Sequence, residues 1–361
     1  MSERYYAANQ YGIHPNYERV LGEMTALASW LSPSPFGNPT MEALSGCEPF
    51  SSLAWSRESP NEFAGRQLIL SQQEFLLEKL ARYIRECCKR DFPLAPGFSD
   101  YAKFFRRLQE HFDVGIYNLN YDTVARTAWP EAFSGFDEWG FFDPLIVAQR
   151  RKWGFIYHLH GSVHHCISHS IARPWIVWKN SLEEEFTDRG VPPVDMAQDF
   201  RSIPLTTLIS GGFKLDQILA EPYQTFYATL VRHIHEASAI LIVGYGFGDL
   251  HVNRAIQNRF ALSDCDARPH PKVAILEKSS PERYRTGRLE IHQFWSWQVK
   301  HTLQTSFHDG SKFQSEDERR IEELMEKGEC EIDVKNRSAI WHGGVGKAFI
   351  AVDKFIEWLA C

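Results

Sequence analysis

The chain has 361 residues, of which 43% are hydrophobic and 24% are charged, and its formal net charge is −7. This composition is ordinary for a globular protein, and the negative charge argues against direct nucleic-acid binding, because phosphate contacts need clustered lysine and arginine. The seven cysteines form no CxxC pair, which disfavours a disulfide scaffold. No apolar run reaches the roughly 18 residues of a membrane span, and the first residues do not resemble a targeting segment. We therefore expect a cytoplasmic protein with no membrane contact.

Apolar residues at helical spacing dominate residues 1–112, which we predict to be a helical region. Glycine, proline and serine cluster over residues 37–52 and predict an irregular connection there. Polar residues that can accept hydrogen bonds from the first turn of a helix mark where three helices begin. They are Asn16, for a helix reaching Leu31, Ser71, which forms a capping box with Glu74 in a helix running to about Cys88, and Ser99, for a helix that carries Phe104 and Leu108.

From residue 113 onward, short β-branched runs alternate with helical patterns. This alternation is typical of a parallel sheet with helices on its faces. We predict an α/β fold, a Rossmann-like parallel sheet with a large N-terminal helical part. The core is predicted to span residues 113–300, and residues 301–361 are predicted to form a C-terminal helical extension that packs on it. The predicted strands are 113–119, 154–159, 206–209, 239–243 and 272–276; the predicted helices are 121–128, a segment through Tyr227 and Ile234, 249–260, a charged helix starting at Ser315 and an amphipathic helix over 349–359.

Three short polar motifs follow predicted strands, and in open α/β sheets the ligand crevice lies beyond the carboxyl ends of the strands. The first motif carries Asn120 and Asp122. Two side chains that are two positions apart at a strand end point the same way, and these two can hydrogen-bond an amide or a sugar hydroxyl. The alternative is an Asn/Asp turn that caps the following helix.

The second motif is His160-Gly161-Ser162. A histidine near its ordinary pKa of about 6.5 can accept a proton at neutral pH, and Gly161 lets a ligand approach the backbone closely. The alternative is a core histidine at a tight turn. Other histidines and a cysteine lie nearby, but their spacing matches no closed metal site, so we predict that no metal is bound.

The third motif, Gly244-Tyr245-Gly246-Phe247-Gly248-Asp249, leads from an apolar strand into a helix. Backbone N–H groups of such a turn, together with the helix N-terminus, can cradle phosphate or ribose. Its glycines fall at alternate positions, so it is not the GxGxxG fingerprint. The alternative is a plain strand–turn–helix connection.

Taken together and in this order, the three motifs resemble those of the sirtuin superfamily, and more closely those of the bacterial sirtuin-like branch found in anti-phage defence systems. The resemblance covers residues 113–278 and includes the segments 209–213 and 221–223. It implies an NAD-binding Rossmann-like domain with Asn120 near the nicotinamide ribose, Asp122 near the nicotinamide amide and His160 as the catalytic base or a ribose-binding group. The cofactor-binding residues that it implies are Gly161, Ser162, Gly244, Tyr245, Gly246, Phe247, Asp249 and Glu277.

The chain departs from the family pattern in two ways. Protein-deacylating sirtuins carry paired CxxC zinc ligands, and their absence here disfavours a deacylase and favours simple hydrolysis of NAD. The family's first strand also ends in a Gly-Ala-Gly-x-Ser loop that holds the NAD pyrophosphate, and this sequence has no such loop. Residues 15–21 resemble a helix that normally follows that loop. The resemblance therefore predicts either a chain that starts late or a fold that survives without its first strand.

We predict a sirtuin-like NAD hydrolase that releases nicotinamide and ADP-ribose, with a role in anti-phage defence through NAD depletion. Such an activity must be held off in healthy cells, so the resemblance implies a homo-oligomer or a protein partner such as an ATPase or a nucleic-acid-sensing effector. Three alternatives stay open: a regulatory module that only binds NAD or ADP-ribose, an NAD-dependent protein deacylase, and an unrelated nucleotide-binding α/β protein.

Overall fold

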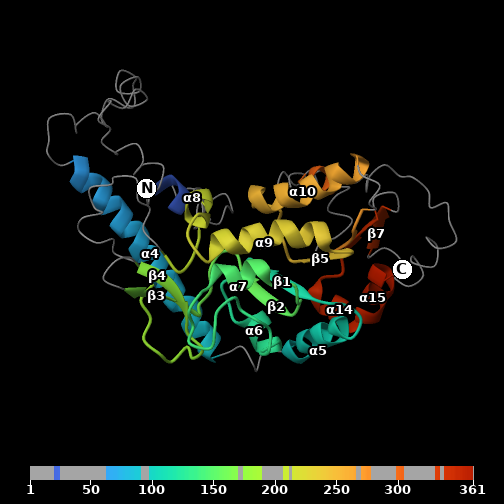
Figure 1. Cartoon of the computed structure of the whole chain (residues 1–361), viewed down its shortest axis with the longest axis horizontal. Helices are drawn as coiled ribbons and strands as arrows, with labels where there is room; N and C mark the ends of the chain where they lie inside the picture. The colour runs from blue at the N-terminus through green and yellow to red at the C-terminus, as the bar shows by residue number, and fades with distance from the viewer. Residues whose placement is uncertain are drawn as a thin grey trace, which may run out of the picture.

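The computed structural model of the chain describes residues 20–24, 62–90, 97–169, 174–188, 206–210, 214–265, 270–277, 298–304, 330–333 and 337–360. Within these ranges, parallel strands lie among helices, which confirms the predicted α/β fold. Helix α4 and the β3–β4 hairpin lie at one end of the long axis, and α14 and α15 lie at the other end (Figure 1). None of the helices in these ranges is both long enough and apolar enough to cross a membrane.

The parallel strands form two separate sheets in the described part of the chain. In the first, β1 (Gly115–Asn118) pairs with β2 (Phe155–His158). In the second, the order is β5-β6-β8-β7, and only the edge strand β7 is antiparallel. Among the described residues, β1 and β5 therefore each have one edge that no strand covers. The strands of the second sheet are β5 (Ala239–Val243), β6 (Lys272–Leu276), β7 (Cys330–Asp333) and β8 (Ser338–Trp341).

Strand β6 shows how the second sheet is sandwiched between two apolar layers. Its side chains alternate in direction, as they must in a strand: Val273 and Ile275 enter one core cluster, whereas Ala274 and Leu276 enter the other. All five residues of β6 are buried, as expected for a central parallel strand that is covered on both faces.

Helices from distant parts of the sequence cover these two faces. The pair α9 and α10 packs on the cluster that holds Phe155, Phe226 and Ile275. On the other face, α5 packs against α14 and α15 around Phe104 and Trp341. The bounds of these helices are α5 (Phe98–Gln109), α9 (Tyr223–Glu236), α10 (Leu250–Cys265), α14 (Val345–Ile350) and α15 (Val352–Ala360).

Helix α4 (Glu62–Arg90) corrects the predicted start of a helix at Ser71. Ser71 lies in the interior of α4, so its spacing with Glu74 does not form a cap. Apolar and good helix-forming residues continue upstream of Ser71, and they extend the helix by about two and a half turns. The helix predicted from Ser99 is present as α5, but Gly97, in a left-handed conformation, occupies its N-cap position.

The strands of the core were predicted better than the elements that surround them. Strands β5 and β6 have the predicted bounds, and β1 and β2 lie within theirs. The strand predicted at 206–209 is wrong, because the described residues of this segment form isolated bridges, such as that between Leu208 and Gly161, and no strand. The helix predicted at 121–128 is shorter, and the amphipathic helix at 349–359 is interrupted at Ala351. Elements that were not predicted are α7 (Pro144–Gln149), α8 (Lys214–Ile218), β3 (His165–His169), β4 (Pro174–Trp178), β7 and β8; the shortened helix is α6 (Val124–Ala128).

Other predictions fall wholly or partly outside the described residues. The cap at Asn16 and the charged helix starting at Ser315 lie outside them, whereas residues 20–24 are helical as expected. The C-terminal segment holds the strands β7 and β8 as well as helices, so the description of residues 301–361 as helical was incomplete. The division into a region 1–112, a core 113–300 and a C-terminal extension stays a prediction.

Candidate functional site

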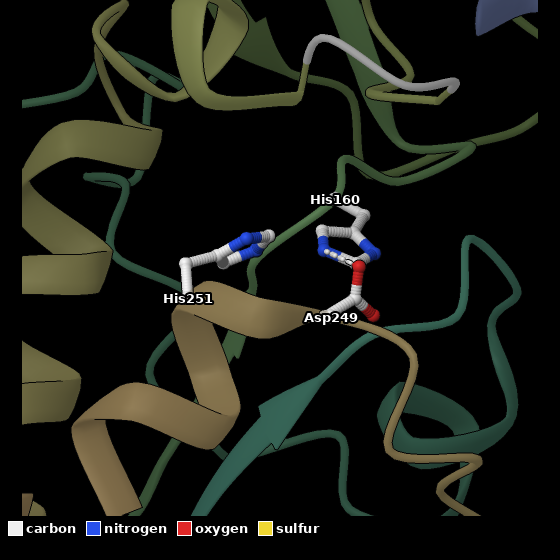
Figure 2. A group of neighbouring side chains, drawn as sticks. All are labelled: His160, Asp249 and His251. Atoms are coloured by element: carbon white, nitrogen blue, oxygen red, sulfur yellow. Dashed lines mark ion pairs between the residues drawn. The ribbon is translucent and has the colours of Figure 1, made fainter. Parts of the chain in front are cut away.

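Two strands from different sheets deliver His160 and Asp249 to the same place. His160 lies two residues beyond β2, and Asp249 lies six residues beyond β5, directly before α10. The distance between His160 Nε2 and Asp249 Oδ1 is 3.7 Å (Figure 2). His251, in the first turn of α10, completes the group, with its ring centroid 5.9 Å from that of His160. The structure thus brings residues of the second and third motifs together.

His160 is a buried, neutral imidazole with an available nitrogen. Its exposed fraction is 3%, and its Nε2 has no hydrogen-bond partner among the described residues. Burial lowers the pKa of His160 to about 4, and the nearby Lys214 and His251 act in the same direction, while Asp249 opposes them. The lowered pKa favours the neutral ring at neutral pH, and its Nε2 lies 3.7 Å from Asp249 Oδ1, beyond hydrogen-bond distance.

Asp249 is held by a cation and by its own helix. Its Oδ1 accepts a hydrogen bond of 2.7 Å from the Nζ of Lys214 on α8. The Tyr245 hydroxyl lies 3.1 Å from the Asp249 carbonyl oxygen and 2.8 Å from Oδ1 of Asn253. The side-chain amide of Asn253 donates a hydrogen bond of 2.8 Å to the Phe247 carbonyl oxygen. These bonds attach the glycine-rich loop to the first turns of α10, so the position of Asp249 is set by the helix.

Phe247 anchors the loop in the core. Its side chain is fully buried, and its φ of 53° lies in the left-handed region, which a non-glycine residue adopts only under constraint. The predicted role of Phe247 in cofactor binding stays a prediction, but the contacts of its side chain are those of a structural anchor.

The three glycines of the loop face open space. A Cβ added at Gly244, Gly246 or Gly248 would meet no atom within 4 Å. Gly244 has a φ of 60°, which favours glycine at the turn itself. The loop therefore leaves room for another molecule to approach its backbone closely at the N-terminal end of α10, where anions are favoured.

The protein's own backbone requires a glycine at position 161. Its φ is 95°, and a Cβ there would lie 2.1 Å from the Thr207 carbonyl oxygen. The close approach that this glycine permits is therefore made by the protein's own chain. Ser162 is fully buried, and its Oγ accepts a hydrogen bond of 3.2 Å from the His164 N–H. Both residues shape the turn that presents His160, and their roles toward NAD stay predictions.

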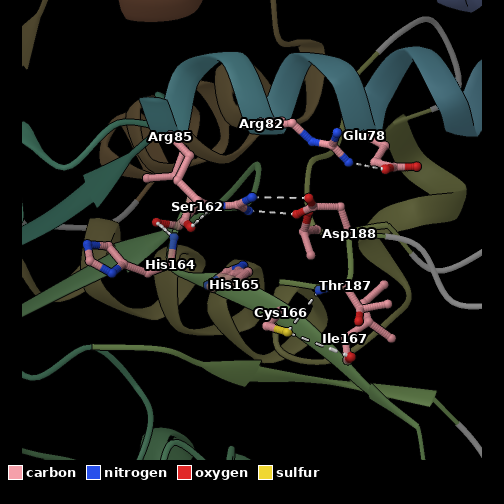
Figure 3. Close-up of polar contacts among 12 residues, drawn as sticks. Glu78, Arg82, Arg85, Ser162, His164, His165, Cys166, Ile167, Thr187 and Asp188 are labelled. Atoms are coloured by element: carbon pink, nitrogen blue, oxygen red, sulfur yellow. Dashed lines mark hydrogen bonds and ion pairs between the residues drawn. The ribbon is translucent and has the colours of Figure 1, made fainter. Parts of the chain in front are cut away.

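A buried ion pair is hydrogen-bonded to the turn that follows His160. The Arg85 guanidinium on α4 makes two hydrogen bonds with the Asp188 carboxylate, at 2.7 and 3.2 Å, and a third with the Val163 carbonyl oxygen at 3.1 Å (Figure 3). The Thr207 hydroxyl donates to Asp188 Oδ1 at 3.0 Å. The network thereby joins α4, the turn after His160 and the segment 206–210.

Asn120 and Asp122 follow β1, as predicted, but their contacts are local. Asp122 Oδ1 accepts a hydrogen bond of 2.9 Å from the Val124 N–H at the start of α6, so the capping alternative is present in the structure. Burial raises the pKa of Asp122. Asn120 is exposed, and its carbonyl oxygen lies 3.4 Å from Nδ1 of His158. The contacts described for Asn120 and Asp122 therefore do not link them to His160 or Asp249.

Glu277 lies where predicted, directly after β6. Its backbone N–H donates to the Trp341 carbonyl oxygen at 2.8 Å, and its carbonyl oxygen accepts from the Gly344 N–H at 3.1 Å. These bonds tie the end of β6 to the turn after β8. The predicted contact of Glu277 with a cofactor stays a prediction.

Three residues near His160 were not predicted. His251 follows Asp249 by two positions, so the continuation of the motif through Asp249-Leu250-His251 could have indicated it. Tyr227 on α9 contacts His251, with 2.8 Å between the hydroxyl oxygen and Nε2. Lys214 stands in no recognisable motif, and only the fold brings it to Asp249.

The fold and this site together define a class, the α/β proteins with a candidate site beyond the carboxyl ends of parallel strands. The model of the SIR2-like domain family matches residues 114–297, just over half of the chain. The chain belongs to this family, which confirms the sirtuin-like resemblance. SIR2-like domains use NAD as a substrate, so the function of the chain is related to NAD. No match to a curated protein was found.

Proposed function

We propose that the chain hydrolyses NAD to nicotinamide and ADP-ribose. The observation that carries the proposal is the state of His160, a neutral imidazole whose Nε2 has no partner among the described residues and faces a carboxylate at the rim of the sheet. A glycine-rich loop with open space above its backbone lies beside it. This combination suits a reaction in which a base must act next to a bound phosphate-bearing substrate.

The proposed reaction loosens the bond between nicotinamide and ribose until C1′ has oxocarbenium character. Asp122 would orient the departing nicotinamide, and Asn120 would hold the ribose and a water molecule. His160 would accept a proton from that water as its oxygen bonds to C1′. Backbone N–H groups near Gly244 and Gly248 would hold phosphate or ribose. The bond electrons leave with nicotinamide, and the hydroxyl of water becomes the C1′ hydroxyl of ADP-ribose.

The electrostatics of the site favour this assignment. Positive charge develops on the ribose in the transition state, and a protonated histidine beside it would repel that charge. Burial keeps His160 neutral, and the Asp249 carboxylate at 3.7 Å supplies negative charge that Lys214 only partly offsets. The same carboxylate would stabilise His160 once it has accepted the proton.

The test is release of nicotinamide from NAD by the purified full chain. Wild type is compared with His160→Ala and Asn120→Ala, and with the control His111→Ala, which removes an exposed histidine just beyond α5. We expect release by wild type and by the control, and a loss of 100-fold or more without His160, in line with the contribution of about 10²–10⁴-fold from a general base. Equal release by His160→Ala would refute the assignment of the base.

A module that only binds NAD or ADP-ribose is the second candidate. What favours it is the separation of β1 and β5 into different sheets in the part of the chain that the structure describes. Two results together would establish this candidate in place of the hydrolase. Calorimetry would show that the purified chain binds NAD, and no nicotinamide would be released by the chain alone or in infected-cell extract.

A role in anti-phage defence, and control by self-association or by a protein partner, belong to the same proposal. The expected signature is a fall in cellular NAD after infection of cells that carry the wild-type chain, and no fall in cells that carry His160→Ala. Sedimentation of the purified chain at several concentrations tests self-association directly, and co-purification from infected cells tests for a partner.

A further inference from the structure

The side chains of His160, Asp249 and His251 form a group with the geometry of metal ligands. Each offers one ligand atom, and these atoms all lie within 4.8 Å of one another. Figure 2 shows the two imidazoles and the carboxylate facing a common centre, with His160 on the turn after β2 and the other two at the start of α10. Among the described residues, this is the group of three or more such side chains that meets these criteria.

A second observation points to a ligand at the same place. His160 is 97% buried, since its exposed fraction is 3%, and its Nε2 has no hydrogen-bond partner in the described part of the chain. A buried polar atom without a partner is destabilising, so its persistence calls for an explanation. The nitrogen is directed toward Asp249, another member of the group, whose Oδ1 lies 3.7 Å away.

We propose that His160, Asp249 and His251 bind Zn²⁺ reversibly, with a water molecule in the fourth position. Two imidazole nitrogens and one carboxylate oxygen are a ligand set that zinc prefers, at about 2.0–2.2 Å from the ion. The ligand atoms lie within 4.8 Å of one another, so closing a tetrahedral site around the ion requires the three side chains to move closer together.

A neighbouring side chain holds the His251 ring in place. The Tyr227 hydroxyl lies 2.8 Å from Nε2 of His251 and restrains that ring. Such supporting bonds to a ligand histidine are what metal sites use to fix ring orientation.

Lys214 limits the affinity of the group for zinc. Its ammonium group lies 2.7 Å from Asp249 Oδ1 and competes with a metal ion for the same carboxylate. Zinc must therefore displace or share this contact, and its affinity is limited by doing so. A change of Lys214 to methionine removes the competing charge, so it should tighten zinc binding, whereas loss of His251 should weaken it.

The consequence for activity rests on the proposed hydrolase function. A zinc ion on His160 Nε2 occupies the electron pair that would accept the proton of water. Zinc should therefore inhibit nicotinamide release, and a chelator should restore it. The site is thus a point at which the availability of a transition metal controls the reaction.

Binding is measured first and without reference to activity. Chelator-treated full chain is titrated with Zn²⁺ by calorimetry and with Co²⁺ by visible absorption, where four-coordinate cobalt gives intense bands. Wild type, His251→Phe, His251→Gln, Lys214→Met and the control His111→Ala are compared, after circular dichroism has shown that each is folded. His251→Gln keeps a polar group that can bond with the Tyr227 hydroxyl.

We expect one ion per chain, binding weakened about tenfold or more in both His251 variants, tighter binding in Lys214→Met and no change in the control. The cobalt spectrum should lack thiolate charge-transfer bands, which would show that cysteines bind the ion instead. Unchanged affinity in both His251 variants, or thiolate bands, would overturn the proposal. Zinc binding with the expected pattern in a chain that releases no nicotinamide would leave the metal site standing and refute the hydrolase.

Discussion

Replacing Arg85 by methionine tests how much the buried ion pair behind the His160 turn contributes to stability. The side chains of Arg85 and Asp188 are 6% and 4% exposed, and two hydrogen bonds join them. Without Arg85, the Asp188 carboxylate keeps the Thr207 hydroxyl but has no opposite charge in that contact. Removal of one partner of a buried pair typically costs about 3–5 kcal/mol.

The double variant Arg85→Met/Asp188→Leu separates the cost of an unpaired buried carboxylate from the cost of the other lost hydrogen bonds. It removes both charges, so the large penalty for an unpaired carboxylate disappears. The Thr207 hydroxyl and the Val163 carbonyl oxygen still lose partners, which costs about 1–3 kcal/mol. We therefore expect the double variant to be more stable than Arg85→Met by about 2 kcal/mol.

Arg82 on the same helix provides the matched control. It makes an ion pair of 2.7 Å with Glu78, but these side chains are 57% and 22% exposed (Figure 3). A pair of this kind contributes about 0.3–0.5 kcal/mol. Urea denaturation followed by circular dichroism gives the free energy of unfolding for all variants. A loss in Arg85→Met no larger than that in Arg82→Met would refute the reasoning.

Three further outcomes follow from the geometry of the site. Gly161→Ala should lose about 2–5 kcal/mol in urea denaturation, because a left-handed alanine is strained and its Cβ meets the Thr207 carbonyl oxygen at 2.1 Å; stability equal to wild type would contradict this. Gly246→Ala should leave stability within about 1 kcal/mol, since a Cβ there meets nothing within 4 Å, but should raise the KM for NAD; an unchanged KM would count against the loop as a binding surface. The value of kcat/KM should fall only as pH drops through about 4, because His160 stays neutral above its lowered pKa. Asp249→Asn should move this fall to lower pH, since Asp249 raises the pKa of His160. A fall centred near pH 6.5 would contradict the burial of the base.

The strands of the core were predictable because their burial leaves a clear pattern in the sequence. Residues 239–243 and 272–276 are short apolar runs bounded by polar or glycine residues, and both became strands at the predicted bounds. Strand β8 was missed, although all its residues are buried, because a run as short as Ser338–Trp341 has no period of its own. Its strand character depends on pairing with β6, and only the folded chain provides that pairing.

The sequence indicated the residues at the ends of the strands, but not those that other parts of the fold bring to them. A histidine and an aspartate at the ends of apolar strands indicated His160 and Asp249, and the structure brings them within 3.7 Å. The contact of Lys214 with Asp249 joins residues 35 positions apart and leaves no local signal. The approach of the Thr207 carbonyl oxygen to Gly161 leaves no local signal either, because the two residues are remote in sequence.

The position of β8 in the sheet constrains how the protein is made. This strand lies between β6 and β7, so the edge of β6 stays open until residues 338–341 have been synthesised. About 65 residues separate the end of β6 from the end of β8, and a ribosome adding about 5–20 residues per second needs roughly 3–13 s to supply them. During that interval the nascent chain carries an apolar strand with an uncovered edge, whose side chains Ala274 and Leu276 still lack Trp341 and Phe355 as neighbours. An edge of this kind readily pairs with other chains, so production of this protein should depend on chaperones that shield the growing chain.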